Sequence, residues 1–159
     1  MKICNTLEEY KKERERGEEV YFYHGSPVKD LSYLLPRPTK VVDGEEYVFA
    51  TPCFWMAAIF SIKIKNFDKH FDLGFYQDLK TKEKTGFIRE LERGNLQRFF
   101  SKQSGWVYYV NPLKFQNDAR LGMQNHEFIC NERVEVLHTQ YIKNVYKILK
   151  NSDALLIYF

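Results

Sequence analysis

Apolar residues occur in short runs separated by polar, glycine- or proline-containing turns, which is the pattern of β-strands joined by short connections. An early pair of runs covers residues 20–24 and 47–50. Later runs cover 106–110, 128–130, 134–137, 141–149 and 154–159. We therefore expect a sheet-rich protein.

Two segments have helical signals. Residues 6–16 open with a Thr-x-x-Glu capping box and stop at Gly17, so they predict a short helix with a solvated, charged face. Thr51 and Pro52 precede an apolar stretch that ends near Ser61, an arrangement that predicts an N-cap, a proline at the first helical position and a buried helix.

Residues 62–103 mix lysines and arginines with aromatics, and we interpret them as an insertion or lid. Residues 86–100 carry apolar positions that allow a helix, with a weak point at Gly94. Basic residues between aromatics are typical of nucleic-acid contacts, but lysines that keep a lid soluble produce the same pattern, and we favour the second interpretation.

The order of these elements predicts an α+β fold with mostly antiparallel strands. The 159 residues, 44% hydrophobic and 16% aromatic, are enough for the core of one domain. We expect that domain to span 1–159, with an N-terminal helix within 1–18 and the helical insertion at 62–103.

Charge and cysteine content say more about the cellular location of the protein than about its binding partner. The net charge of +3 does not by itself require nucleic acid or an anionic membrane. Cys4, Cys53 and Cys130 are widely spaced, the first residues are charged rather than apolar, and no run reaches membrane-spanning length. We expect a reducing, cytoplasmic location and no membrane contact.

The most informative motif is Tyr23-His24-Gly25-Ser26, at the end of the first predicted strand. Gly25 lets a ligand approach the backbone and Ser26 adds a hydroxyl group, so the strand end predicts a ligand cleft against residues 47–50. The alternative is that His24 is a buried histidine that hydrogen-bonds the main chain.

Other residues join this candidate cleft. Arg37, between two prolines in an extended loop over 31–43, is placed to meet a phosphate or an adenine, although a plain surface arginine is an equal alternative. Phe60, at the end of the predicted buried helix, is the candidate aromatic for the cleft.

Several enzyme classes are disfavoured by missing motifs. The chain has no Gly-x-Gly-x-x-Gly turn, no Gly-Lys-Ser/Thr loop and no Gly-x-Ser-x-Gly elbow. His126-Glu127-x-x-Cys130 looks like part of a zinc-protease motif, but residues four apart on a strand do not converge, so we expect no metal.

In combination, these pieces resemble the His-Tyr-Glu branch of the ADP-ribosyltransferase superfamily, which includes poly(ADP-ribose) polymerases and diphtheria-type toxins. The resemblance rests on the His24-Gly25-Ser26 motif, the strand 47–50, the helix that contains Ala57 to Phe60, and a glutamate that opens a late strand. It covers most of the chain apart from 62–103 and the N-terminal helix.

This resemblance implies split antiparallel sheets that clasp NAD+, and transfer of a single ADP-ribose to a macromolecular acceptor, protein or nucleic acid, with release of nicotinamide. His24 would hold a ribose hydroxyl, the Gly25 backbone would pair with the nicotinamide carboxamide, and Phe60 would stack on nicotinamide. The remaining residues that we assign to NAD+ binding are Ser26, Arg37 and Thr51.

The catalytic glutamate has three candidates. Glu127 precedes two apolar residues and so begins a strand cleanly, whereas Glu132 lies in a polar run typical of a turn, and Glu135 is a weaker third choice. We prefer Glu127. A carboxylate suits the position because cleavage at the ribose C1 builds oxocarbenium-like charge.

Two alternative functions stay open at this stage. One is an NAD+-using enzyme that resembles tRNA 2′-phosphotransferases, for which only Arg37 is well placed to hold the RNA phosphate. The other is a catalytically silent nucleotide- or protein-binding module, because Phe60 stands where the family usually has a stacking tyrosine.

Overall fold

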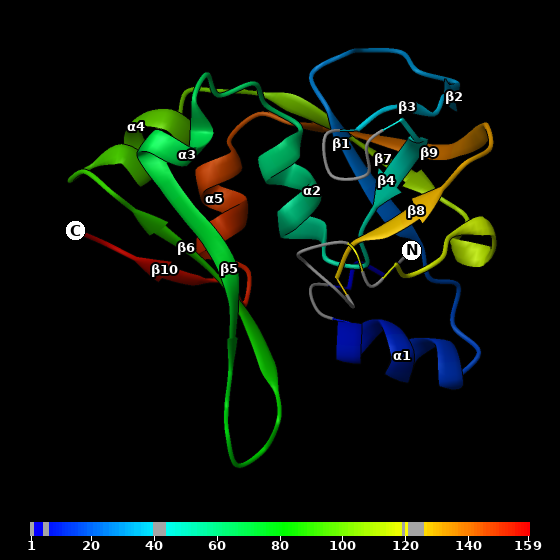
Figure 1. Ribbon diagram of the computed structural model, residues 1–159, viewed down its shortest axis with the longest axis horizontal. Helices are drawn as coiled ribbons and strands as arrows, with labels where there is room; N and C mark the ends of the chain where they lie inside the picture. The colour runs from blue at the N-terminus through cyan, green and yellow to red at the C-terminus, as the bar shows by residue number, and fades with distance from the viewer. Residues whose placement is uncertain (1, 5–6, 40–43, 119, 121–125) are drawn as a thin grey trace.

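The computed structural model describes residues 2–4, 7–39, 44–118, 120 and 126–159 (Figure 1). Its strands are β1 (Phe22–Ser26), β2 (Tyr33–Leu34), β3 (Arg37–Pro38), β4 (Glu46–Ala50), β5 (Phe71–Gln77), β6 (Lys84–Glu90), β7 (Gly105–Val110), β8 (Phe128–Cys130), β9 (Val134–Ile142) and β10 (Leu155–Ile157). Its helices are α1 (Leu7–Glu15), α2 (Phe54–Phe60), α3 (Phe67–His70), α4 (Asn95–Phe100), α5 (Val145–Lys150) and the 3-10 turn η1 (Pro112–Lys114).

The strands pair mostly antiparallel, which confirms the α+β class. Within the described residues they form sheets of order β1-β7-β9-β2, β3-β4-β8 and β10-β6-β5. The pairing of β10 with β6 is parallel. A single bridge, between Tyr23 and Thr51, links β1 to the end of β4 among the described residues.

Helix α2 lies at the centre of the molecule. Figure 1 shows α2 and α5 between the sheet that contains β5 and the sheet that contains β1. Every α2 residue except Phe60 is buried, as the run of apolar residues predicts, and Trp55 is the largest of the buried side chains. The helix begins later than predicted: Cys53 is the N-cap, and the Thr51 hydroxyl accepts a hydrogen bond from the Cys53 N–H at 3.0 Å.

The prediction of a helical insertion is wrong for much of residues 62–103. Residues 84–90 form β6, and only α4 matches the helix expected over 86–100. Gly86, Ile88 and Glu90 are buried on alternate positions, so the strand period of two describes them better than the helical one. Phe71 and Phe100 belong to the same core cluster as Trp55, so this segment packs into the body of the protein.

The strand expected over residues 141–149 is also wrong in its second half. Strand β9 ends at Ile142, and Asn144 then caps α5 by accepting a hydrogen bond from the Lys147 N–H at 3.0 Å. Val145 and Leu149, one helical turn apart, are fully buried. An asparagine cap followed by this spacing is a helix signal that the β-branched and aromatic content obscured.

Other predicted elements are found with small changes. Gly17 has a φ of +78°, as expected for the glycine that ends a helix, whereas Thr6 of the capping box lies outside the described residues. Glu13 is buried and pairs with Lys2 at 2.6 Å, so the charges of α1 are not all solvated. No helix of the described residues is long and apolar enough to cross a membrane.

Glu90, the last residue of β6, hydrogen-bonds the start of α4 and Phe159. Its carboxylate accepts hydrogen bonds from the backbone N–H groups of Gly94, Leu96 and Phe159 at 3.0–3.1 Å, and the side chain is buried. Burial favours the neutral acid, but these three donors together hold the pKa of Glu90 below its ordinary value.

Replacing Glu90 with Ala is therefore expected to lower the free energy of unfolding by about 2–3 kcal/mol, because the buried N–H of Leu96 and the part-buried N–H groups of Gly94 and Phe159 lose their acceptor. Because the folded-state pKa is the lower one, the wild-type carboxylate stabilises the fold above the unfolded-state pKa. This stabilisation is lost as the pH falls through the folded-state pKa. Urea denaturation at pH 7 and pH 4 measures both effects. Equal stability of wild type and variant at pH 7 would contradict this role.

Candidate functional site

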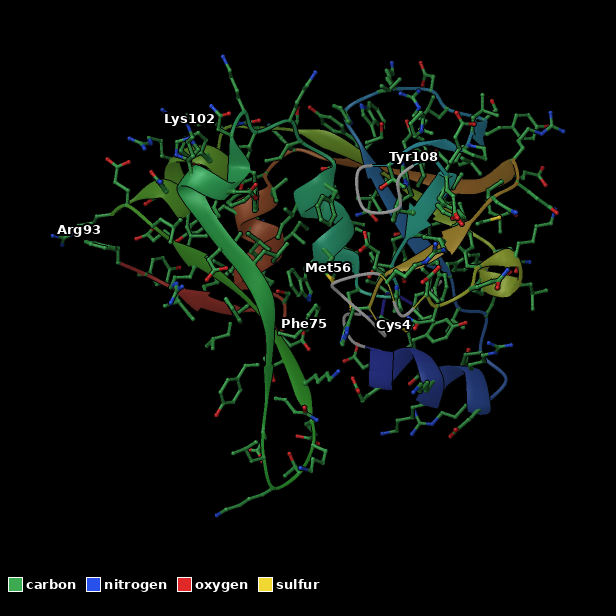
Figure 2. The ribbon with its side chains drawn as sticks, in the orientation of Figure 1. Cys4, Met56, Phe75, Arg93, Lys102 and Tyr108 are labelled. Atoms are coloured by element: carbon green, nitrogen blue, oxygen red, sulfur yellow. The ribbon has the colours of Figure 1, made fainter. Side chains whose placement is uncertain are left out.

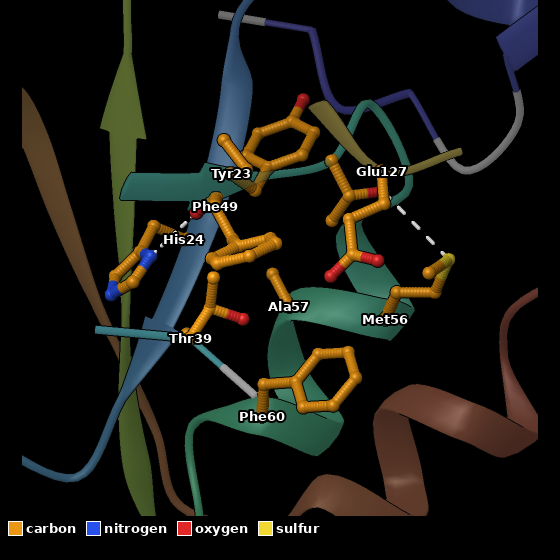
Figure 3. A pocket seen from close by; sticks show the side chains of 11 residues that line it. Tyr23, His24, Thr39, Phe49, Met56, Ala57, Phe60 and Glu127 are labelled. Atoms are coloured by element: carbon orange, nitrogen blue, oxygen red, sulfur yellow. Dashed lines mark hydrogen bonds between the residues drawn. The ribbon is translucent and has the colours of Figure 1, made fainter. Parts of the chain in front are cut away.

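Five of the residues predicted for the site line one pocket. A cavity of about 330 Å³ opens beside the junction of β1, β4 and α2 (Figure 3). The predicted residues that line it are His24, Gly25, Thr51, Phe60 and Glu127. The other lining residues are Tyr23, Thr39, Phe49, Ala50, Met56 and Ala57.

The pocket exists because β1 and β4 separate. Tyr23 and Thr51 exchange two backbone hydrogen bonds of 2.8 and 2.9 Å. In a continued antiparallel ladder, the next such pair would be Gly25 with Phe49. Instead, the Nδ1 of His24 lies 2.7 Å from the carbonyl oxygen of Phe49. The histidine ring thus takes an acceptor that a continued strand would use.

This separation leaves the backbone of Gly25 at the pocket edge. Alternate residues of a strand direct their N–H and C=O groups to the same side, so Gly25 shares the edge that Tyr23 uses for its bonds to Thr51. Its α-carbon faces α2: a Cβ there would lie 1.9 Å from the Ala57 carbonyl oxygen. The missing side chain is therefore required for helix packing, a reason that sequence analysis did not identify.

His24 is held as a neutral hydrogen-bond acceptor. A carbonyl oxygen accepts only, so Nδ1 carries the proton and Nε2 keeps its lone pair. Burial lowers the pKa of His24, the bond to Phe49 opposes this shift, and the positive charge of Arg37 adds to it. At neutral pH the ring can therefore accept a hydrogen bond from a ligand hydroxyl. The structure shows a histidine that is both tied to the main chain and part of the pocket wall.

Glu127 supplies the negative charge of the pocket. It immediately precedes β8, and Figure 3 shows its carboxylate pointing into the space near Ala57 and Phe60. Burial raises the pKa of Glu127. Among the described residues, no hydrogen bond or ion pair is found to this carboxylate. A carboxylate without such partners can stabilise positive charge that develops beside it.

The alternative glutamates lie elsewhere. Glu132 is exposed in the turn after β8 and forms an ion pair with Lys114 at 2.9 Å. Glu135 lies on β9, paired with Tyr33 of β2, and is exposed. Neither lines the pocket that contains His24. The preference for Glu127 is based on a strand that begins directly after it, and β8 does begin at Phe128. The turn predicted around Glu132 is also found.

Phe60 is the exposed end of an otherwise buried helix. Its side chain is 46% exposed, and it lines both the candidate pocket and a neighbouring hollow near Phe67 and Leu73. An exposed ring at a pocket mouth is available to stack on a planar ligand. Thr51, by contrast, is buried, and its hydroxyl already contacts the Cys53 N–H and the Met56 sulfur.

A second pocket, of about 420 Å³, adjoins the first. The two share His24, Thr39 and Phe49. Arg37 and Ser26 also line the second pocket, together with Tyr33, Leu35 and Tyr47. Ser26 is buried and accepts a hydrogen bond from the Val28 N–H at 3.2 Å. We call the two pockets together the bipartite site; among the described residues that line the second pocket, Arg37 carries the positive charge.

Sequence analysis missed Phe49, Met56 and Thr39 as lining residues. The signal for Phe49 was present: in β4, Val48 and Ala50 are buried on one face, so Phe49 and Tyr47 share the other. Met56 precedes Ala57 in a helix that is buried almost throughout, and nothing in its pattern separates a lining residue from a core residue. Thr39 lies at the end of an extended loop, where the sequence has no periodicity.

The described residues contain no group of three or more His, Cys, Asp or Glu side chains arranged to hold a metal ion. Comparison of the chain with protein-family models, curated proteins and solved structures found no match. Inference about function therefore rests on the geometry of the bipartite site.

Proposed function

We propose that this protein is an NAD+-dependent mono-ADP-ribosyltransferase, with the split-sheet fold of that superfamily. The observation that supports this best is that Glu127 and His24, far apart in the sequence, line one pocket at the separation of two strands. A carboxylate beside a neutral hydroxyl acceptor suits a ribose at which a glycosidic bond is cleaved.

The two pockets of the bipartite site would each take one half of an extended dinucleotide. The pocket with Glu127 and Phe60 would take the nicotinamide and its ribose, and the pocket with Arg37 would take the adenosine and phosphates. Arg37 offers a planar pair of donors for phosphate oxygens. His24 lies where the two pockets join, and would accept a hydrogen bond from a ribose hydroxyl through Nε2. The Gly25 backbone would pair with the carboxamide.

Glu127 would act on the charge of the transition state. The bond from ribose C1 to the nicotinamide nitrogen breaks, its electron pair leaves with nicotinamide, and positive charge develops on the sugar. The half-buried carboxylate of Glu127 stabilises that charge. The oxygen or nitrogen of the acceptor then bonds to C1 and gives up its proton, for which Glu127, the carboxylate that lines this pocket, is the proposed base.

The direct test is release of nicotinamide from NAD+ by the purified protein, with and without cell lysate as a source of macromolecular acceptor. We expect the protein to release nicotinamide, and we expect lysate to stimulate this release. With adenine-labelled NAD+, label should appear on a macromolecule of the lysate. Absence of both release and calorimetrically detected NAD+ binding would overturn the proposal and favour a silent binding module.

His24 is expected to contribute to NAD+ affinity through Nε2. In a His24→Asn variant the amide nitrogen can replace Nδ1 as donor to Phe49, but the Nε2 acceptor is lost, so the Kd should rise about 3–10-fold. Isothermal calorimetry measures this change.

The wild-type affinity should also depend on pH. It should be constant near neutrality and fall as the pH drops through the lowered pKa of His24, because protonation removes the Nε2 acceptor. His24→Asn should not show this fall. An unchanged Kd in the variant would contradict the role of Nε2.

A further inference from the structure

One cross-strand pair of the β5–β6 hairpin, Phe75 with Gly86, packs against sequence neighbours of residues that line the candidate pocket. Figure 1 shows this hairpin extending past the body of the protein. Phe75 of β5 pairs with Gly86 of β6. Phe75 is the last partly buried residue of β5, since Tyr76 and Gln77 are exposed. Figure 2 shows Phe75 directed from β5 toward the body.

Phe75 stacks on the residue before Glu127. The rings of Phe75 and His126 are face to face, with centroids 3.8 Å apart and an interplanar angle of 24°. His126 is 3% exposed. The stack thus fixes the backbone on one side of Glu127, and the pairing of β8 with β4 fixes it on the other.

Trp55 packs against the same cross-strand pair, at Gly86. A Cβ on Gly86 would lie 2.2 Å from the Cζ2 atom of Trp55, so the glycine makes room for the indole ring. Trp55 precedes Met56, which lines the candidate pocket. The Phe75–Gly86 pair therefore packs against His126 and Trp55, the residues that directly precede the lining residues Glu127 and Met56.

Glu127 depends on such support. Because no described residue makes a hydrogen bond or ion pair to its carboxylate, its position is set by its backbone and by the packing around it. A displacement of about 1 Å at a reacting group can cost about 10²-fold in rate.

We propose that Phe75 and His126 are positioning residues that hold Glu127 in place, so that the Phe75–Gly86 pair of the β5–β6 hairpin supports the candidate site. This inference rests on the proposed function for its kinetic consequences, but the positioning itself can be measured without turnover.

The kinetic experiment compares Phe75→Leu, which keeps apolar bulk but loses the ring stack, with Phe75→Tyr, which keeps the ring. Tyr76→Leu is the matched control, because Tyr76 is the adjacent aromatic and is 61% exposed. We expect Phe75→Leu to lower kcat for nicotinamide release about 10–100-fold with KM for NAD+ unchanged. Phe75→Tyr and Tyr76→Leu should retain kcat. An unchanged kcat in Phe75→Leu, or an equal loss in Tyr76→Leu, would overturn the proposal.

A second readout separates this proposal from the proposed function. Titration of the Glu127 carboxyl carbon by NMR, assigned by its absence in Glu127→Gln, reports its surroundings even if wild type releases no nicotinamide. In Phe75→Leu the raised pKa of Glu127 should move toward its ordinary value as water reaches a less ordered side chain, and in Tyr76→Leu it should not move. An unchanged titration in a folded Phe75→Leu protein would refute positioning whatever the activity.

Discussion

Replacing Glu127 with Gln should lower nicotinamide release from NAD+ by about 10²–10³-fold, the usual cost of losing one preorganised group that stabilises transition-state charge. Glutamine has nearly the same shape but no charge, so NAD+ binding measured by calorimetry should change little. The loss should therefore appear in kcat. Single-turnover assays of nicotinamide release measure it directly.

The stability of Glu127→Gln distinguishes a functional carboxylate from a structural one. Burial raises the pKa of Glu127, so above both the folded- and unfolded-state pKa values the charged form opposes folding. The variant should therefore unfold at the same or a higher temperature than wild type at pH 7. Glu132→Gln is the matched control, since Glu132 is exposed and paired with Lys114, and it should keep full activity. A loss of activity in Glu132→Gln that exceeds the loss in Glu127→Gln would assign the reaction to the other glutamate.

Among substitutions of the residues that line the candidate pocket, Gly25→Ala should cause the largest loss of stability. A Cβ at this position would lie 1.9 Å from the carbonyl oxygen of Ala57 and 2.6 Å from the backbone nitrogen of Ser61. These are backbone atoms of α2 and its C-cap, so the helix itself would have to move from β1. We expect the free energy of unfolding to fall by about 3 kcal/mol or more. Urea denaturation followed by circular dichroism measures this loss.

Gly74→Ala provides the comparison for this substitution. A Cβ on Gly74 would lie 3.0 Å from the end of the Phe87 side chain, which can shift by a few tenths of an ångström. The variant should therefore lose much less stability than Gly25→Ala. If Gly25→Ala were as stable as Gly74→Ala, the close approach of β1 and α2 would not be a requirement of the fold.

Several features were predictable because their signals are local. The motif at His24 and Gly25, the apolar run of α2 and the turn around Glu132 each follow from neighbouring residues whose conformational preferences agree with the final structure. The preference for Glu127 also came from local pattern, since a strand begins directly after it. Sequence alone thus determined the α+β class, most of the strands and the residues that were candidates for one site.

Tertiary structure decided what local pattern left undetermined. Residues 84–90 became a strand because they pair on one side with β5 of the same hairpin and on the other with β10, which is far away in the sequence, and these hydrogen bonds outweigh helical propensity. The opening of the pocket, the lining role of Phe49 and the Phe75–His126 stack likewise depend on which strand lies beside which. Hydrophobic periodicity reports which face of an element is buried, but not what buries it. The partner comes from residues far away in the sequence, so only the folded chain determines it.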